Sequence, residues 1–163
     1  MKIRAYLDIE TTGLSFCFSE ITVIGVAVEH CADLRVTQLV GQEISDLKVF
    51  EILAGVEELY TYNGSRFDLP FIKAALRIDL KTRFRHRDLM YDCWRNNLKG
   101  GLKVVEQTLG INRKLKNIDG RMAVKLWWHY KNNNNPNALK TLLDYNAEDI
   151  INLKALRQIL RVN

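Results

Sequence analysis

The chain has 163 residues, of which 47% are hydrophobic and 26% charged, a composition typical of one compact domain rather than of a disordered tract. Its formal net charge of +5 favours a polyanionic partner such as nucleic acid, although a generic basic surface fits the charge equally well. The absence of a long apolar run or a signal peptide excludes a membrane span, so we expect a single non-membrane domain over residues 1–163.

The cysteines predict no zinc site and no disulfide framework. Their number is odd, and no two of them form a Cys-x-x-Cys pair: Cys17, Cys31 and Cys93. Reduced thiols are therefore expected, together with a cytoplasmic location. No obligate protein partner is evident from the sequence.

The first part of the chain is predicted to be mostly strands. The apolar runs at 2–7, 21–28 and 34–40 indicate an antiparallel meander. A short helix is expected over 45–53, and a further strand over 58–62.

The rest of the chain is predicted to be mostly helical. A helix from about 68 to 77 follows the Asn63-Gly64 turn, and 82–87 is expected to form a short edge strand. Four further helices are predicted at 89–96, 102–109, 120–130 and 138–160, with 131–137 as a surface loop. The order predicts an α/β fold: a mixed sheet, with an antiparallel meander followed by parallel strands, and helices on both faces.

Asp8 and Glu10 are the first candidate functional residues. Residues i and i+2 of a strand face the same side, so both carboxylates are expected to point together near the end of the first strand. Two solvated acids on an exposed strand face would fit the spacing too. The apolar neighbours Ala5, Leu7 and Ile9 favour a buried strand, where acids need a partner or a cation.

Two later segments contribute further candidates. Asp68 begins a predicted helix, so it is either a functional acid or a first-turn residue favoured by the helix dipole. Asn63 is either a functional residue or a turn residue, and the two roles are compatible. Tyr145 and Asp149 lie one turn apart on one face of the last helix, although a core tyrosine and a solvated acid would have the same spacing.

Taken together, the four acids suggest a metal site. Carboxylates that converge on one place repel one another, and divalent cations would neutralise them. Two ions about 3.5–4 Å apart can clamp the attacking and leaving oxygens of a phosphodiester displacement. The all-oxygen ligand set of Asp8, Glu10, Asp68 and Asp149 suits Mg²⁺ or Mn²⁺ better than zinc.

Three motifs in order resemble a known family. They are Asp8-Ile9-Glu10-Thr11-Thr12-Gly13, the run from Asn63 to Asp68, and Tyr145-Asn146-Ala147-Glu148-Asp149. The set resembles the tyrosine branch of the DEDD-type 3′–5′ exonucleases, in the ribonuclease H-like superfamily, and the likeness covers nearly the whole chain. It implies a ribonuclease H-like fold, two Mg²⁺ or Mn²⁺ ions, and a substrate that is single-stranded DNA or RNA or a duplex with a frayed 3′ end.

The resemblance also implies roles. Asp8 would bridge both ions, Glu10 and Asp149 would complete the site of the ion that activates water, and Asp68 would support the second ion. Tyr145 would orient the attacking water, because a phenol with a pKa near 10 is a poor base at neutral pH.

Other residues are expected to contact the substrate. Thr11, Thr12 and Leu14 occupy positions that touch the terminal nucleotide in the family, and Asn63 is placed with them. Several basic residues either follow the phosphate backbone or lie in solvated loops: Arg66, Lys99, Lys103, Arg113, Lys114 and Lys116.

Three alternatives stay open. A catalytically inactive nucleic-acid-binding module of the same fold would have one or more acids misplaced. An endonuclease of the same superfamily would share the acids, and only the Tyr-x-x-x-Asp pair favours the exonuclease, by analogy. A two-carboxylate glycosidase would need neither Asp149 nor a metal.

Overall fold

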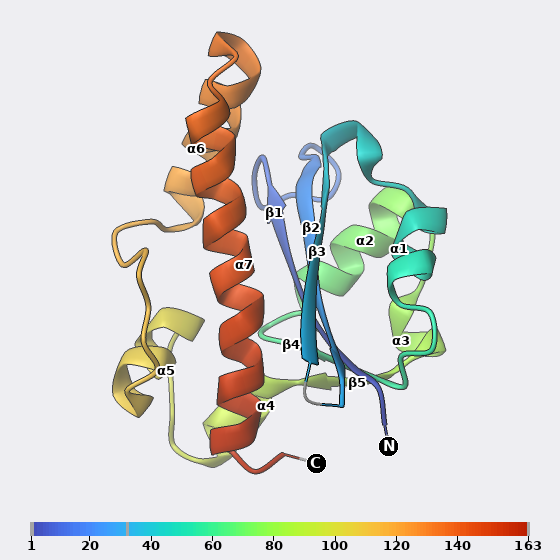
Figure 1. Ribbon diagram of the computed structural model, residues 1–163, viewed down its shortest axis with the longest axis vertical. Helices are drawn as coiled ribbons and strands as arrows, with labels where there is room; N and C mark the ends of the chain where they lie inside the picture. The colour runs from blue at the N-terminus through green and yellow to red at the C-terminus, as the bar shows by residue number, and fades with distance from the viewer. Residues whose placement is uncertain (1, 32, 163) are drawn as a thin grey trace.

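The computed structural model describes residues 2–31 and 33–162, which form a five-stranded mixed sheet covered by helices on both faces (Figure 1). The strand order is β3-β2-β1-β4-β5. Strands β1, β2 and β3 pair antiparallel, whereas β1, β4 and β5 pair parallel. The strands span Arg4–Thr11 (β1), Ile21–His30 (β2), Asp33–Val40 (β3), Glu58–Thr61 (β4) and Arg85–Asp88 (β5). The predicted fold class is confirmed.

The helices divide between the two faces of the sheet (Figure 1). One face carries α1 (Asp46–Ile52), α2 (Asp68–Leu76) and α3 (Leu80–Arg83). The other carries α4 (Leu89–Arg95), α5 (Leu102–Leu109), α6 (Gly120–Asn133) and α7 (Pro136–Ile159), and the 3-10 turn η1 (Gly41–Glu43) follows β3. Within the described ranges, none of these helices has the length and apolar character needed to cross a membrane.

Strand β1 separates an apolar face from a polar one. Ala5, Leu7 and Ile9 belong to the core beneath α1, α2 and α3. The strand period of two therefore turns Asp8 and Glu10 toward α7. Strand β1 continues to Thr11, so both acids lie within it. The predicted range of 2–7, which would leave the acids beyond the end of the strand, was too short.

A glycine allows α7 to approach the sheet closely at this point. Gly25 of β2 pairs with Asp8, and a Cβ added at Gly25 would lie 2.0 Å from Oδ1 of Asn146. Any side chain at position 25 would displace Asn146, because real Cβ atoms do not approach other atoms so closely. The break in the β-branched run of β2 thus makes room for the helix.

Two predicted boundaries are wrong. The segment 82–87 is not one strand, because Asp79 accepts a hydrogen bond from the Lys81 N–H (3.1 Å) and caps the short helix α3, which leaves only β5 as strand. The expected loop 131–137 is largely helical. There Asn134 takes a left-handed conformation (φ 49°) that ends α6, and the Asn135 side chain caps α7, so the asparagines act as helix stops and starts.

Candidate active site

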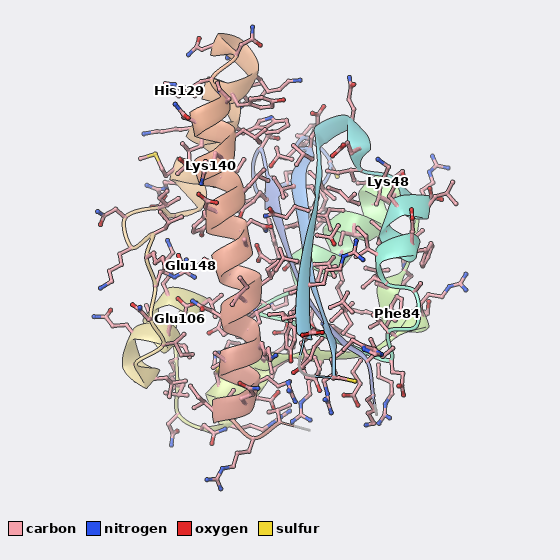
Figure 2. All side chains as sticks on the ribbon, viewed as in Figure 1. Lys48, Phe84, Glu106, His129, Lys140 and Glu148 are labelled. Atoms are coloured by element: carbon pink, nitrogen blue, oxygen red, sulfur yellow. The ribbon has the colours of Figure 1, made fainter. Side chains whose placement is uncertain are left out.

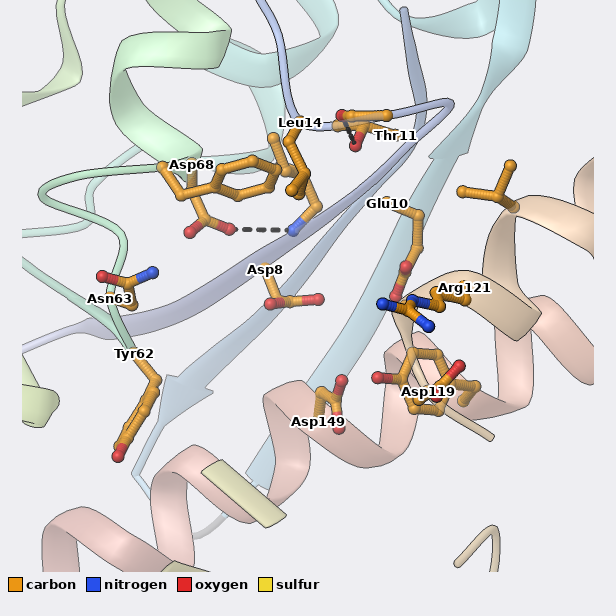
Figure 3. A pocket seen from close by; sticks show the side chains of 16 residues that line it. Asp8, Glu10, Thr11, Leu14, Tyr62, Asn63, Asp68, Asp119, Arg121 and Asp149 are labelled. Atoms are coloured by element: carbon orange, nitrogen blue, oxygen red, sulfur yellow. Dashed lines mark hydrogen bonds between the residues drawn. The ribbon is translucent and has the colours of Figure 1, made fainter. Parts of the chain in front are cut away.

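A cavity of about 480 Å³ lies where β1, the β1–β2 loop, α2, α6 and α7 meet. All four predicted acids and Tyr145 line it. Figure 3 shows Asp8 between Asp68 on one side and Asp149 on the other, with Glu10 further along β1. Residues from three distant stretches of the chain therefore face one hollow, as the motif spacing requires.

Three of the acids are close enough to share an ion. One carboxylate oxygen from each of Asp8, Glu10 and Asp149 lies within 4.8 Å of the other two. Burial, and then the charges of neighbouring carboxylates, raise the pKa of Asp8 and of Glu10 well above the ordinary value for each. Burial also raises the pKa of Asp149 to about 6, against the opposing effect of Arg113. The cluster is therefore short of positive charge.

Asp68 lies outside this trio but lines the same cavity. Its side chain is 3% exposed, and Oδ1 accepts a hydrogen bond from the Ile9 N–H of β1 (3.1 Å). Burial raises the pKa of Asp68 to about 7. Asp68 is thus the acidic first-turn residue of α2, as one of the two interpretations predicted, and its carboxylate also reaches across to β1.

Tyr145 lies one helical turn before Asp149 on α7. Its ring is buried, with Lys103 Nζ 4.8 Å from the ring centroid. Burial, reinforced by the charges of Asp149, Glu10 and Asp8, raises the pKa of Tyr145 above the ordinary phenol value. At neutral pH the side chain is therefore a neutral hydrogen-bond donor.

Asn146 is a residue of the site that the sequence analysis missed. Its Nδ2 donates to Oδ2 of Asp8 (3.0 Å), and its Oδ1 accepts from Nε2 of Gln38 on β3 (2.9 Å). The amide fixes the orientation of Asp8, and the hydrogen bond tends to lower the pKa of that carboxyl. The glycine at position 25, in an otherwise β-branched run, was the available signal.

Arg113 was predicted either to follow the phosphate backbone or to lie in a solvated loop, and its buried contacts with carboxylates fit neither role. Its side chain is only 6% exposed. Nε and Nη2 donate to the two carboxylate oxygens of Glu106 (2.6 and 2.9 Å), and Nη2 also donates to Oδ1 of Asp149. Arg113 is thus a buried partner of a candidate metal ligand and does not lie where it could follow a phosphate backbone.

The predicted substrate-binding residues divide into two groups. Thr11, Leu14 and Asn63 line the cavity, and Leu14 is 85% exposed at its edge. Three others lie beyond the lining: Thr12, whose Oγ1 accepts from the Glu20 N–H, the exposed Arg66, and Lys103, which lines a neighbouring cavity with Arg113. The lining also includes Asp119 and Arg121, at the start of α6, which were not predicted.

Comparison with known proteins places this arrangement in a family. Residues 5–161 match the family model described as the RNase H superfamily. The chain belongs to the RNase H superfamily. YprB, an uncharacterized protein of Bacillus subtilis (strain 168), is 30% identical over 166 residues, which cover 93% of the chain. The match takes in 40% of the length of YprB, so this RNase H domain corresponds to less than half of that relative.

Solved structures share the RNase H-like fold. A family B DNA polymerase from Pyrobaculum calidifontis superposes with a TM-score of 0.74 at 16% identity, over 99% of this chain and 25% of the polymerase chain. Brucella melitensis NrnC bound to pGG superposes with a TM-score of 0.67 at 18% identity, over 97% of this chain and 71% of NrnC. At such identities the likeness establishes the fold.

The residues of this RNase H superfamily member also fit a hard divalent cation. The clustered donors are all carboxylate oxygens, and the trio carries more negative charge than Arg113 alone can offset. Mg²⁺ and Mn²⁺ prefer such ligands. Brucella melitensis NrnC, which shares the fold, has also been solved with bound Mg²⁺.

Proposed function

We propose that the protein is a metal-dependent 3′–5′ exonuclease. It would hydrolyse phosphodiester bonds at the end of single-stranded DNA or RNA, or at a frayed 3′ end of a duplex. The observation that carries the proposal is the convergence of Asp8, Glu10 and Asp149 on one open cavity, with Tyr145 beside them. That set of side chains suits phosphodiester hydrolysis better than a two-carboxylate glycosidase, which needs only a pair of acids.

Asp8, Glu10 and Asp149 would hold the cations, with support from Asp68. When bound, two Mg²⁺ or Mn²⁺ ions would supply positive charge that stabilises the attacking and leaving oxygens. Hydrogen bonds within the protein orient two of the site residues, because Asn146 donates to Asp8 and the Ile9 N–H donates to Asp68. Such prior ordering lowers the cost of reaching the reactive geometry.

Tyr145 would orient the attacking water. With its pKa raised by burial and by three carboxylates, the phenol keeps its proton at neutral pH and can donate one hydrogen bond. It therefore acts in positioning and not as a general base.

The substrate end would enter at the edge of the cavity formed by the β1–β2 loop. Leu14 and Thr11 would contact the terminal nucleotide, together with Asn63, which lines the same cavity. Arg66 and Lys103 lie outside the lining, where they would contact phosphates further along the strand. Thr12 would act indirectly, by fixing the loop through its hydrogen bonds with Glu20.

The deciding experiment is digestion of single strands of DNA and RNA labelled at either the 5′ or the 3′ end. With Mg²⁺ or Mn²⁺, a 5′-labelled strand should shorten one nucleotide at a time, whereas a 3′-labelled strand should release its label at once. Chelation should stop both reactions. Circular single strands should survive, because cleavage of a circle would indicate the endonuclease, and no cleavage of any strand would indicate a binding module.

A further inference from the structure

Arg113 contacts three carboxylates from two helices. It pairs with Glu106 of α5, touches Asp149 of α7, and has Nη1 3.7 Å from Oε2 of Glu148. Figure 2 shows Glu106 and Glu148 on the side of the molecule where α5 lies against α7. The guanidinium therefore links α5 to the candidate site on α7.

The pair with Glu106 anchors this guanidinium. Glu106 is almost fully buried, and its Oε1 also accepts a hydrogen bond from Nδ2 of Asn152 on α7 (2.9 Å). A planar guanidinium that meets a carboxylate through two parallel hydrogen bonds has a fixed direction as well as a fixed place. The remaining hydrogen of Nη2 therefore points in a defined direction, toward Asp149.

The contact between Arg113 and Asp149 has two effects, one on the orientation of Asp149 and one on the charge of the trio. Because Nη2 donates to Oδ1, the carboxylate of Asp149 cannot rotate freely, and its Oδ2 is not engaged by this contact. A buried positive charge beside the trio also reduces the repulsion among its members. The same charge opposes the binding of any further cation nearby.

We propose that Arg113 is a positioning residue that holds Asp149 in place for Asp8 and Glu10 and limits the affinity of the trio for a divalent cation. Arg113 lies behind Asp149, so the proposal gives it no contact with substrate. The inference rests on the proposed function only for its effect on turnover, since its effect on cation binding stands without any nuclease activity.

The test compares wild type with Arg113→Gln and Arg113→Lys. In Mn²⁺ titrations followed by calorimetry, Arg113→Gln should bind Mn²⁺ several-fold more tightly, because it removes a like charge. Arg113→Lys keeps the charge and should bind Mn²⁺ as wild type does. Both variants should lose about 10–100-fold in kcat with little change in KM, since neither side chain can hold Glu106 and Asp149 together.

The controls separate positioning from plain stability. Lys140→Gln removes an exposed cation from the same helix and should leave Mn²⁺ affinity and kcat unchanged. If both Arg113 variants lower only the unfolding temperature, with Mn²⁺ affinity and kcat of the folded protein unaltered, the proposal is overturned. If wild type binds Mn²⁺ but cleaves no strand, the nuclease proposal fails, and the Arg113→Gln titration alone then decides whether Arg113 tempers cation binding.

Discussion

Helix α7 meets the sheet at two buried clusters of charge that are built in opposite ways. In the candidate site, three acids, Asp8, Glu10 and Asp149, cluster together, and Arg113 contacts Asp149. At the other cluster, toward the end of α7, a single acid, Glu29 of β2, is shared by two cations: Lys154 Nζ lies 3.2 Å from Oε1 and Arg157 Nη2 lies 3.3 Å from Oε2.

The pKa shifts follow from this difference. Although burial opposes it, hydrogen bonds from Tyr6 and Lys154 lower the pKa of Glu29. In the candidate site, burial raises the pKa of each acid instead, reinforced by neighbouring carboxylates for Asp8 and Glu10 and by Glu106 for Asp149. The acid with sufficient partners joins α7 to the sheet, whereas the acids without them hold unsatisfied charge that a ligand can neutralise.

Replacing Asp8 should produce the largest effect. Asp8→Asn keeps an acceptor for Asn146 but removes one charge from the trio. We expect activity on end-labelled strands to fall by more than about 100-fold. In chelator, the free energy of unfolding should rise by about 1–2 kcal/mol, because the repulsion is relieved. A variant that stays active, or that unfolds more readily in chelator, would contradict the view that the candidate site holds excess negative charge for catalysis.

Replacing Arg157 should lower the stability of the protein and leave its activity unchanged, the reverse of the result expected for Asp8→Asn. Arg157→Met leaves Glu29 and the Tyr6 hydroxyl without a buried guanidinium, and removal of one partner from a buried ion pair costs about 3–5 kcal/mol. Urea denaturation should show that loss, while kcat per folded molecule stays at the wild-type value. A drop in kcat without a loss of stability would contradict a structural role for this cluster.

The stability of the metal-free protein should depend on pH through the same contrast. The unfolded chain releases its aspartate protons near pH 4, whereas the folded site holds them until about pH 6 for Asp149 and about pH 7 for Asp68. The folded state thus binds more protons in that window, so stability falls as pH rises from about 4 to about 7.

Thermal unfolding between pH 4 and 8, in chelator and in Mg²⁺, measures this dependence. The unfolding temperature should fall with pH in chelator, and Mg²⁺ should abolish most of the fall. Glu29 has a lowered pKa, so the stability that it contributes is lost only as pH falls below the ordinary pKa of a glutamate. A flat profile in chelator would mean that the trio is not short of positive charge.

The smallest effect is expected at Tyr145. Tyr145→Phe preserves the buried ring and removes only the hydroxyl, so kcat should fall by about 10-fold, equivalent to roughly 1.4 kcal/mol. Affinity for a labelled strand, measured in Ca²⁺, should change less than kcat. A variant that binds substrate poorly but turns it over at the normal rate would place Tyr145 in binding and not in orienting water.

The sequence sufficed for features that depend on near neighbours. The alternation of Ala5, Leu7 and Ile9 with acids predicted a strand with one apolar and one acidic face, and the strand-rich first part predicted the meander. Spacing alone also placed Tyr145 and Asp149 on one face of a helix. These inferences need only the local period of the backbone.

Features that depend on distant partners were not accessible. Arg113 lies in a run of basic residues that is typical of a solvated loop, and only the folded chain brings Glu106 and Asp149 to either side of it. Asn146 resembles any polar helix residue until Gly25 is seen to leave space for it. Buried polar pairs of this kind form between residues whose separation in sequence carries no local signal.

The contact between Asn146 and Asp8 joins residues 138 positions apart, and it has a consequence for biosynthesis. A growing chain possesses the first strand early but lacks the closing helix until α7 has been translated. Under the proposed activity, a nascent chain that lacks α7 also lacks Tyr145 and Asp149, so it cannot cleave nucleic acid. The order of the elements along the chain thus withholds any such activity until α7 has been translated.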